Sequence, residues 1–183
     1  MKELSLNILD ISHNSIKAKA DTISITVSES ISKDLISIEI ADNGCGMEET
    51  LLEKITDPFV TTRTTRKVGL GIPLIRQHAL DTDGEFRIDS KVGVGTTLFA
   101  SFKLTHLDRA PLGDVASTIT SLIMAAPDTR FVYTHNTDVG SFVLDTDVLK
   151  SELDGISLAE PEILIWIGEY INENLQNISG GKI

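Results

Sequence analysis

The sequence predicts an α/β fold, specifically a two-layer α+β sandwich in which helices cover one face of a mixed sheet, followed by a small C-terminal α+β extension. Two observations predict it. Residues 2–19 carry apolar side chains at helical spacing, and several later segments alternate apolar with polar side chains as half-buried strands do. The length of 183 residues suits one domain, or one domain with an appendage.

The first part of the chain is expected to run helix, two strands, two helices, two strands. Leu4, Ile8, Ile11 and Ile16 predict the first helix, because their spacing places them on one face. The later strands alternate Ile, Val, Leu or Phe with polar residues, and a glycine-containing turn over 91–95 separates the last two. The predicted elements are strands over 22–27 and 34–42, helices over 47–55 and 71–80, and strands over 84–90 and 96–104.

The second part of the chain is expected to add helices and one hairpin. The predicted elements are a helix over 113–126, hairpin strands over 130–135 and 141–146 around 136–140, and helices over 146–153 and 160–175. The last helix carries a stripe of apolar residues, for which a core position is favoured over a partner surface. The stripe is made of Ile163, Ile167, Tyr170 and Ile171, with Trp166 beside it.

A change in charge and in turn residues marks a boundary at about residue 105, between a domain of residues 1–104 and an acidic extension of residues 105–183. Of the chain's 27 acidic and 16 basic residues, 12 acidic and 4 basic residues lie after the boundary. Pro111 and Gly113 interrupt the regular patterns just beyond it.

The composition excludes several classes of function. A net charge of −11 argues against a nucleic-acid partner, and against attachment to a membrane through a basic face. The apolar runs are far shorter than the ~20 residues that span a bilayer, and the N-terminus lacks the apolar region of a signal peptide. These features favour a cytoplasmic protein.

The cysteine and the histidines are not expected to form a disulfide or a metal site. Cys45 is the single cysteine, which excludes a disulfide within the chain and a multi-cysteine zinc site. For Cys45 itself, a small buried filler is favoured over a redox switch. The four histidines lack the spacing of metal ligands and are expected to be structural: His13, His78, His106 and His135.

Three glycine clusters predict a nucleotide site. They are DNGCGM (42–47), GLGIPL (69–74) and GVGTTL (93–98). Glycine lets the backbone approach a ligand closely, and the second cluster opens a helix whose first amides can hold phosphate. One such cluster would be weak evidence, but three in order at the ends of predicted elements are much stronger. The Walker-type pattern G-x-x-x-x-G-K-[ST] is absent.

Five motifs together resemble the ATP-binding domain shared by gyrase B, heat-shock chaperones of ninety kilodaltons, histidine kinases and MutL, the GHKL superfamily. ILDISHNSIKAKA resembles the N-box, DNGCGM the G1 box, TDPFVTTR the F box, VGLGIPLIRQHA the G2 box and GVGTTLFASF the G3 box. They cover residues 3 to about 104 in the family's order, and their sequences are most similar to those of histidine kinases. The resemblance implies a Bergerat-type fold with a mostly antiparallel sheet.

The resemblance also implies a role for individual residues in binding ATP and Mg²⁺. Asn14 would bind Mg²⁺, Lys17 a phosphate and Asp42 the adenine amino group. Taken singly, each could instead be a surface residue or a turn former. The other residues implied in the site are Gly44 and Gly46 against the base, Phe59 at the start of a lid, Thr61, Thr62, Arg63 or Arg66 in the lid, Gly69, Leu70 and Gly71 at the triphosphate, and Thr96, or Thr97 if the register differs by one, at the adenine.

Asp10 is the candidate catalytic residue. In hydrolases and serine kinases of the superfamily a Glu lies four residues before the box Asn, and Asp10 holds that place before Asn14 with a side chain one methylene shorter. It could act as a general base. An acid that supports Mg²⁺ or caps a turn is an equal alternative, and the shorter side chain makes efficient ATP hydrolysis doubtful.

The expected function is signalling with Mg·ATP. The lid is short, and Arg63, Arg66 and Lys67 concentrate positive charge there, where they could neutralise a transferring phosphoryl group. The alternative is an exposed, disordered loop whose charges serve solubility. The N-box begins at residue 3, leaving no room for a phosphoacceptor histidine domain before it, so the resemblance is to a stand-alone module. It would phosphorylate or regulate a separate, unidentified protein, with a homodimer left open. The alternatives are an ATP-dependent binding switch without transfer, and a slow ATPase.

Overall fold

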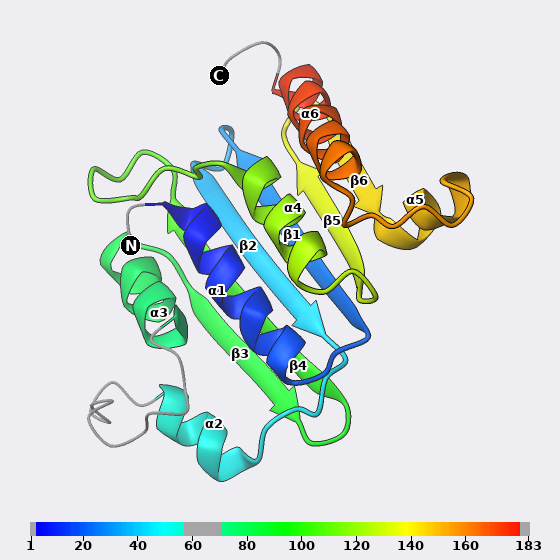
Figure 1. The fold of residues 1–183 in the computed structure, drawn as a ribbon. Helices are drawn as coiled ribbons and strands as arrows, with labels where there is room; N and C mark the ends of the chain where they lie inside the picture. Colours follow the sequence, from blue (N-terminus) through cyan, green and yellow to red (C-terminus); the bar gives the residue numbers. More distant parts are fainter. Residues whose placement is uncertain (1–2, 57–70, 180–183) are drawn as a thin grey trace.

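The computed structural model describes residues 3–56 and 71–179 of the chain (Figure 1). All the helices and strands expected from the sequence are present, with bounds that differ by a few residues. In chain order they are α1 (Leu4–Lys17), β1 (Thr22–Ser30), β2 (Leu35–Asp42), α2 (Glu49–Thr56), α3 (Gly71–Asp81), β3 (Phe86–Lys91), β4 (Gly95–Lys103), α4 (Val115–Ala125), β5 (Arg130–Asn136), β6 (Ser141–Asp145), α5 (Thr146–Glu152) and α6 (Pro161–Ile178).

The strands form one six-stranded sheet in the order β3-β4-β2-β1-β5-β6. All neighbours are antiparallel except β1 and β5, which run parallel. Helices α3, α1, α4 and α6 lie side by side across one face of this sheet (Figure 1). The predicted two-layer arrangement with a mixed, mostly antiparallel sheet is therefore confirmed. The C-terminal extension continues the same sheet through β5 and β6.

Alternation along the strands separates a buried face from an open one. In β1, Ile23, Ile25 and Val27 are completely buried beneath the helices, while the residues between them are partly exposed. The polar end of β1 continues beyond the predicted strand to Ser30, because it pairs with the start of β2 at Leu35. Backbone pairing thus extends the strand past the region in which apolar alternation is visible.

Helix α1 packs its apolar stripe onto this buried face. Leu4 and Ile8 are completely buried and Ile11 nearly so. No side chain caps the start of the helix; instead the N–H of Leu4 donates to the carbonyl oxygen of Pro111 (2.9 Å) and the N–H of Ser5 to that of Leu112 (2.8 Å). The first amides of a helix have no partner within it, so the extension supplies the acceptors.

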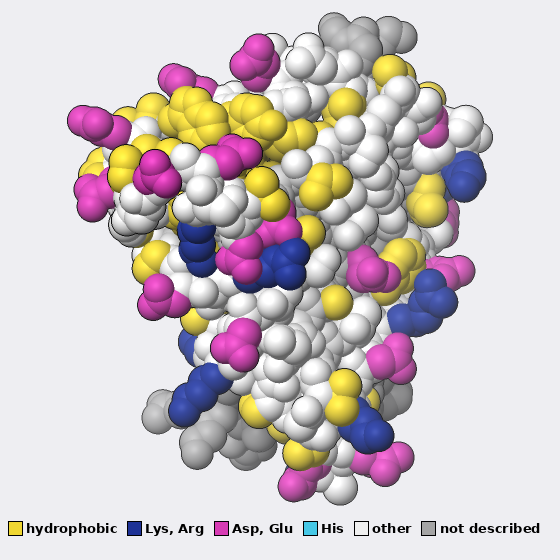
Figure 2. Space-filling view, turned by 90° about the vertical axis from the view of Figure 1, so that its right-hand side faces the viewer, with side chains coloured by type: hydrophobic (Ala, Val, Ile, Leu, Met, Phe, Trp, Pro, Cys, Tyr) yellow, Lys and Arg dark blue, Asp and Glu magenta, His cyan; other side chains and the backbone are white. Residues whose placement is uncertain are grey.

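The apolar stripe of α6 belongs only partly to the core. Ile167 and Ile171 are completely buried, as expected. Trp166 and Tyr170 instead remain 44% and 36% exposed, with their rings stacked 5.4 Å apart. Figure 2 shows hydrophobic side chains gathered on this side of the molecule, bordered by acidic ones. The expectation of a core position was therefore wrong for the two aromatic residues, because they lie at the edge of the face that α6 turns to the sheet.

Within residues 3–56 and 71–179, no helix combines the length and the apolar character required to cross a lipid bilayer.

Helix α4 depends on a side-chain cap, which gives a test of local stability. The Asp114 carboxylate accepts hydrogen bonds from the hydroxyl (2.6 Å) and the backbone N–H (2.8 Å) of Ser117. We expect Asp114→Ala to lower the free energy of unfolding by about 1 kcal/mol at pH 7, the usual cost of losing such a cap. Urea denaturation measures it. Asp108→Ala is the control, because the exposed Asp108 carboxylate has no hydrogen-bond partner among the described residues, and a cost equal to that of Asp114→Ala would contradict the assignment.

The same cap predicts a pH dependence. The Ser117 hydrogen bonds hold the pKa of the Asp114 carboxyl below its ordinary value of 3.8. A lowered pKa in the folded state stabilises the protein above the unfolded-state pKa, and this contribution disappears as the pH falls through the folded-state value. The difference between wild type and Asp114→Ala should therefore shrink below pH 3.8.

Candidate functional site

A cavity of about 290 Å³ lies at the C-terminal end of α1, beside α2 and the ends of β2 and β4. Its walls are largely apolar and include Ile40, Ile72 and Leu98. The volume is close to the lower end of the range for small-molecule sites, about 300–1,000 Å³. Five of the residues expected in the ATP site line this cavity together: Asn14, Lys17, Asp42, Gly46 and Thr96.

Two hydrogen bonds hold the carboxylate of Asp42, the last residue of β2. Its Oδ2 accepts from the Ser15 hydroxyl at 2.6 Å, and its Oδ1 accepts from the backbone N–H of Gly44 at 2.9 Å. An ionised carboxylate has about four acceptor sites, so each oxygen retains one for a ligand. The bonds therefore orient Asp42 at the edge of the cavity without exhausting its capacity to accept.

Thr96 is the cross-strand neighbour of Asp42 in the β2–β4 ladder. Its hydroxyl lies 2.8 Å from that of Ser90, which also donates to the carbonyl of Gly95 and accepts from the N–H of Met47. Thr97 is exposed and is not among the cavity residues, since successive side chains of a strand point to opposite faces. Of the two alternatives, Thr96 is the one that faces the cavity.

The loop after β2 lies so close to neighbouring segments that two of its positions require glycine. Gly46 has a φ of +66°, and a Cβ there would lie 2.0 Å from the carbonyl oxygen of Lys91. A side chain is excluded at Gly46 by this neighbouring strand. Gly44 is similarly close to Ala18, where a Cβ would lie 2.9 Å away. Gly44 does not line the cavity, but its N–H positions Asp42.

Asn14 and Lys17 lie three residues apart on α1 and therefore on neighbouring positions of the helix surface. Mg²⁺ takes oxygen ligands and usually keeps several waters, with nucleotide phosphates supplying further ligands. The amide oxygen of Asn14 suits an ion held mainly by the nucleotide in this way. In the described part of the chain, no group of three His, Cys, Asp or Glu side chains could hold a metal alone.

Asp10 lies outside this cavity and is exposed. Its neighbour is Gly71, the buried first residue of α3, where an added Cβ would lie 3.2 Å from that of Asp10. The first amides of α3, which have no hydrogen-bond partner within the helix itself, begin at this point. Asp10 and Gly71 thus lie next to each other, one helical turn before Asn14.

The lid residues named from the motifs lie outside the described residues. They are Phe59, Thr61, Thr62, Arg63, Arg66, Lys67, Gly69 and Leu70.

Cys45 corrects an expectation. The sequence favoured a small buried filler, whereas Cys45 is exposed and lines the cavity. The reason is the backbone of the loop. The N–H of Cys45 donates to the carbonyl of Ala18 (2.9 Å) and its carbonyl accepts from the N–H of Gly93 (2.8 Å), so the backbone faces its neighbours and the thiol faces outward.

Sequence reasoning missed the residues that support the site. Ser15 was detectable, because it occupies the next position of the stripe formed by Leu4, Ile8 and Ile11, where an apolar residue is expected. Asn43 accepts hydrogen bonds from the N–H groups of residues 21 and 22, at 2.9 Å each, and so ties the loop to the start of β1. Ser90 and Asn43 had no comparable signal, since polar residues are ordinary in turns and at strand ends.

Among solved structures, the fold is similar to that of the ATPase domain of Aquifex aeolicus MutL complexed with ADP. The TM-score is 0.54 at 15% sequence identity, and the superposition covers 85% of this chain and 68% of the MutL chain. At this identity the likeness concerns the fold alone.

Relatives found by sequence include bacterial kinases. The chain is 38% identical over 97 residues to the signal transduction histidine-protein kinase AtoS of Escherichia coli (strain K12), which covers 53% of this chain and 16% of AtoS. It is 32% identical over 98 residues to sporulation kinase C of Bacillus subtilis (strain 168), and this match covers 52% of this chain and 22% of sporulation kinase C. The chain thus spans less than a quarter of either relative. Residues 2–106 match the family described as histidine kinase-, DNA gyrase B- and HSP90-like ATPase. With more than half of its length in that match, the chain belongs to this ATPase family of the GHKL superfamily.

Proposed function

We propose that the chain binds Mg·ATP in the cavity at the end of α1 and uses it in signalling, by transferring the γ-phosphoryl group to a separate protein or by regulating that protein. One observation carries the proposal: Ser15 and Gly44 fix the Asp42 carboxylate at the edge of an apolar cavity. Membership of the ATPase family and similarity to sensor kinases support it.

The adenine end of the proposed site combines shape with one charged acceptor. The free acceptor positions of Asp42 would receive the adenine amino group, and a hydrogen bond to an ionised group is stronger than a neutral one. Ile40 and Leu98 supply apolar surface for the base, and Thr96 lies beside Asp42. These features favour a purine with an exocyclic amino group.

The phosphate end would be formed by α1 and the lid. Lys17 supplies positive charge, and the Asn14 amide oxygen would join the phosphates around Mg²⁺, which neutralises phosphoryl charge when bound. Thr61, Thr62 and Arg63, with Gly69 and Leu70, are proposed as further contacts. Asp10 is proposed as general base because it precedes Asn14 by one turn and lies next to Gly71. A role in supporting Mg²⁺ is the alternative for Asp10.

Affinity for ATP tests the adenine assignment. Asp42→Asn replaces one carboxylate oxygen by an NH₂ group that faces hydrogen-bond donors. The variant should therefore lose a hydrogen bond to a charged group, which contributes about 1.5–3 kcal/mol. We expect the affinity for Mg·ATP, measured by calorimetric titration, to fall at least tenfold. Asp89→Asn is the matched control, because Asp89 is an exposed strand residue. Equal affinity in wild type and Asp42→Asn would refute the assignment.

The orienting role of Ser15 gives a second test. Ser15→Ala removes one of the two bonds that fix Asp42. We expect a roughly fivefold to tenfold weaker affinity for Mg·ATP, the effect of about one hydrogen bond. Ser12→Ala on the same helix is the control, since Ser12 is also buried but its hydroxyl has no hydrogen-bond partner in the described part of the chain. If both variants weaken ATP binding equally, a general change in α1 is responsible and the orienting role is wrong.

The fate of the γ-phosphate distinguishes the proposed reaction from its alternatives. With γ-labelled ATP, label on a partner protein indicates transfer, released phosphate indicates a slow ATPase, and bound but unreacted ATP indicates a binding switch.

The role of Asp10 is tested by its variants. We expect Asp10→Asn to keep the affinity for ATP and to lose most of any turnover, because it removes the base without touching the cavity. Asp10→Glu restores the longer side chain and should react faster. Unchanged turnover in Asp10→Asn would exclude Asp10 as the base.

A further inference from the structure

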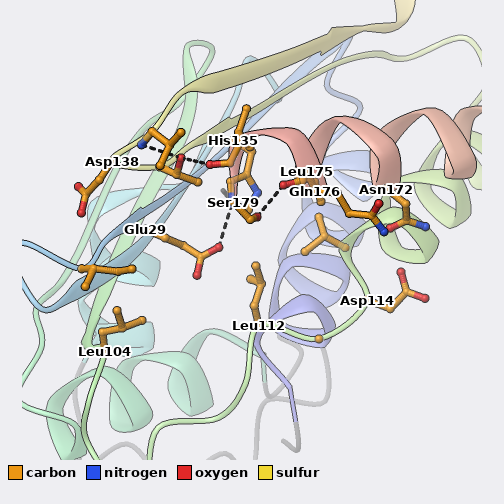
Figure 3. Close-up of a pocket in the computed structure, with 16 residues that line it drawn as sticks. Glu29, Leu104, Leu112, Asp114, His135, Asp138, Asn172, Leu175, Gln176 and Ser179 are labelled. Carbon is orange, nitrogen blue, oxygen red and sulfur yellow. Dashed lines mark hydrogen bonds and ion pairs between the residues drawn. The ribbon is translucent and has the colours of Figure 1, made fainter. Parts of the chain in front are cut away.

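A second, larger cavity of about 790 Å³ lies between the ATPase family domain and the C-terminal extension (Figure 3). Glu29, Leu104 and Leu112 come from the first part of the chain and its connection to α4, whereas His135 and Leu175 come from β5 and α6. The volume is within the range of small-molecule sites, about 300–1,000 Å³. The proposed nucleotide function makes no use of this cavity.

The two cavities lie at opposite ends of the sheet. Residue 23 of β1 pairs with Asp42 at the cavity proposed to bind ATP, here called the nucleotide cavity. Glu29 lies near the other end of the same strand. At about 3.3 Å per residue, they are separated by roughly 20 Å along the strand. The larger cavity is therefore a separate site.

A chain of hydrogen bonds through the buried side chain of His135 positions Glu29. The hydroxyl of Tyr133 lies 2.5 Å from Nδ1 of His135, whose Nε2 lies 2.9 Å from Oε1 of Glu29. Burial, and next the charge of Glu29, raise the pKa of Tyr133 above its ordinary value, so the phenol keeps its proton. Nε2 of His135 donates to Glu29, because an ionised carboxylate can only accept. His135 is only 3% exposed and Tyr133 is completely buried, so Glu29 is anchored to side chains of the core.

Glu29 has acceptor capacity that this chain does not use. Figure 3 shows its carboxylate directed into the space bordered by Leu104, Leu112 and Ser179. Only Oε1 is bonded, and Oε2 has no hydrogen-bond partner among the described residues. A carboxylate with one oxygen anchored and the other directed into a cavity is arranged to receive a donor from a ligand.

The charge of the lining favours a cation. Besides Glu29 it contains Asp114 and Asp138, and no Lys or Arg within the described ranges. The hydrogen bonds of Asp114 with Ser117, and those of Asp138 with the N–H of Ser32 and the hydroxyls of residues 30 and 32, lower the pKa of both carboxyls and give each of their oxygens a partner. These two acids add negative potential, and Glu29 is distinguished from them by an oxygen that has no hydrogen-bond partner among the described residues.

We propose that this cavity binds a small organic cation, with an alkylammonium group paired to Glu29 and an apolar body packed against the surrounding leucines. Leu104, Leu112 and Leu175 supply that apolar surface, with Ile178 and Val139 beside them. Because the cavity is formed jointly by the family domain and the extension, the ligand would contact both. This site gives the extension a binding function that is independent of ATP.

Matched probes test the charge requirement in the wild-type protein without nucleotide. Hexylamine is protonated at pH 7, whereas hexanol is neutral and hexanoate is anionic, and the three have the same apolar chain. In ¹⁵N-resolved NMR titrations we expect hexylammonium to shift the amides of Glu29, Leu112 and Leu175 and to bind at least tenfold more tightly than hexanol. Hexanoate should not bind. Equal affinities, or shifts confined to other residues, would overturn the proposal.

A variant pair tests the role of Glu29. Glu29→Gln keeps an oxygen that can accept from His135 but removes the charge, so hexylammonium affinity should fall at least tenfold. Glu39→Gln is the control, because Glu39 is an exposed glutamate of β2 outside the cavity. An unchanged affinity in Glu29→Gln would overturn the proposal. Because no nucleotide is present, neither result bears on the proposal that the chain binds ATP. The titrations of the wild-type protein test the cation site even if the Glu29→Gln variant does not fold.

Discussion

The position of α1 is the constraint on which the rest of the molecule depends. Its apolar stripe from Leu4 to Ile11 fills the centre of the helix layer, and the next residue of that stripe, Ser15, donates to Asp42. The extension holds the start of the helix through backbone carbonyls, and the residue after its end, Ala18, accepts from the loop after β2. Burial of one helix therefore sets the geometry of the core and of the nucleotide cavity together, and a shift of α1 would move Asn14 away from Asp42.

The parallel pairing of β1 with β5 is the second organising contact, since it joins the extension to the family domain within one sheet. The family match ends at residue 106, little more than half of the chain, whereas the likeness to the MutL ATPase domain covers 85% of it. That likeness must include part of the extension. The β1–β5 junction also brings Glu29 and His135 together, so the second cavity exists because the extension joins the sheet at this strand.

The two cavities differ in the chemistry of their acceptors. At the nucleotide cavity, Asp42 is fixed by short bonds to a hydroxyl and an amide, and Lys17 supplies positive charge nearby. At the second cavity, Glu29 is fixed by the buried ring of His135, and the acidic residues Asp114 and Asp138 also belong to its described lining. The two proposed ligands, an anionic nucleotide and a small organic cation, would thus bind at opposite ends of one sheet.

The sequence by itself determined the order and type of the elements, because periodicity is local. The alternation of Ile23, Ile25 and Val27 defines a strand whatever lies beside it, and the ordered glycine motifs indicated the family before any contact was known. Only the tertiary structure decided which residues meet across long separations. No local period encodes that β5 pairs with β1, that a serine orients Asp42, or that the thiol of Cys45 faces outward, because these depend on hydrogen bonds between segments far apart in the chain.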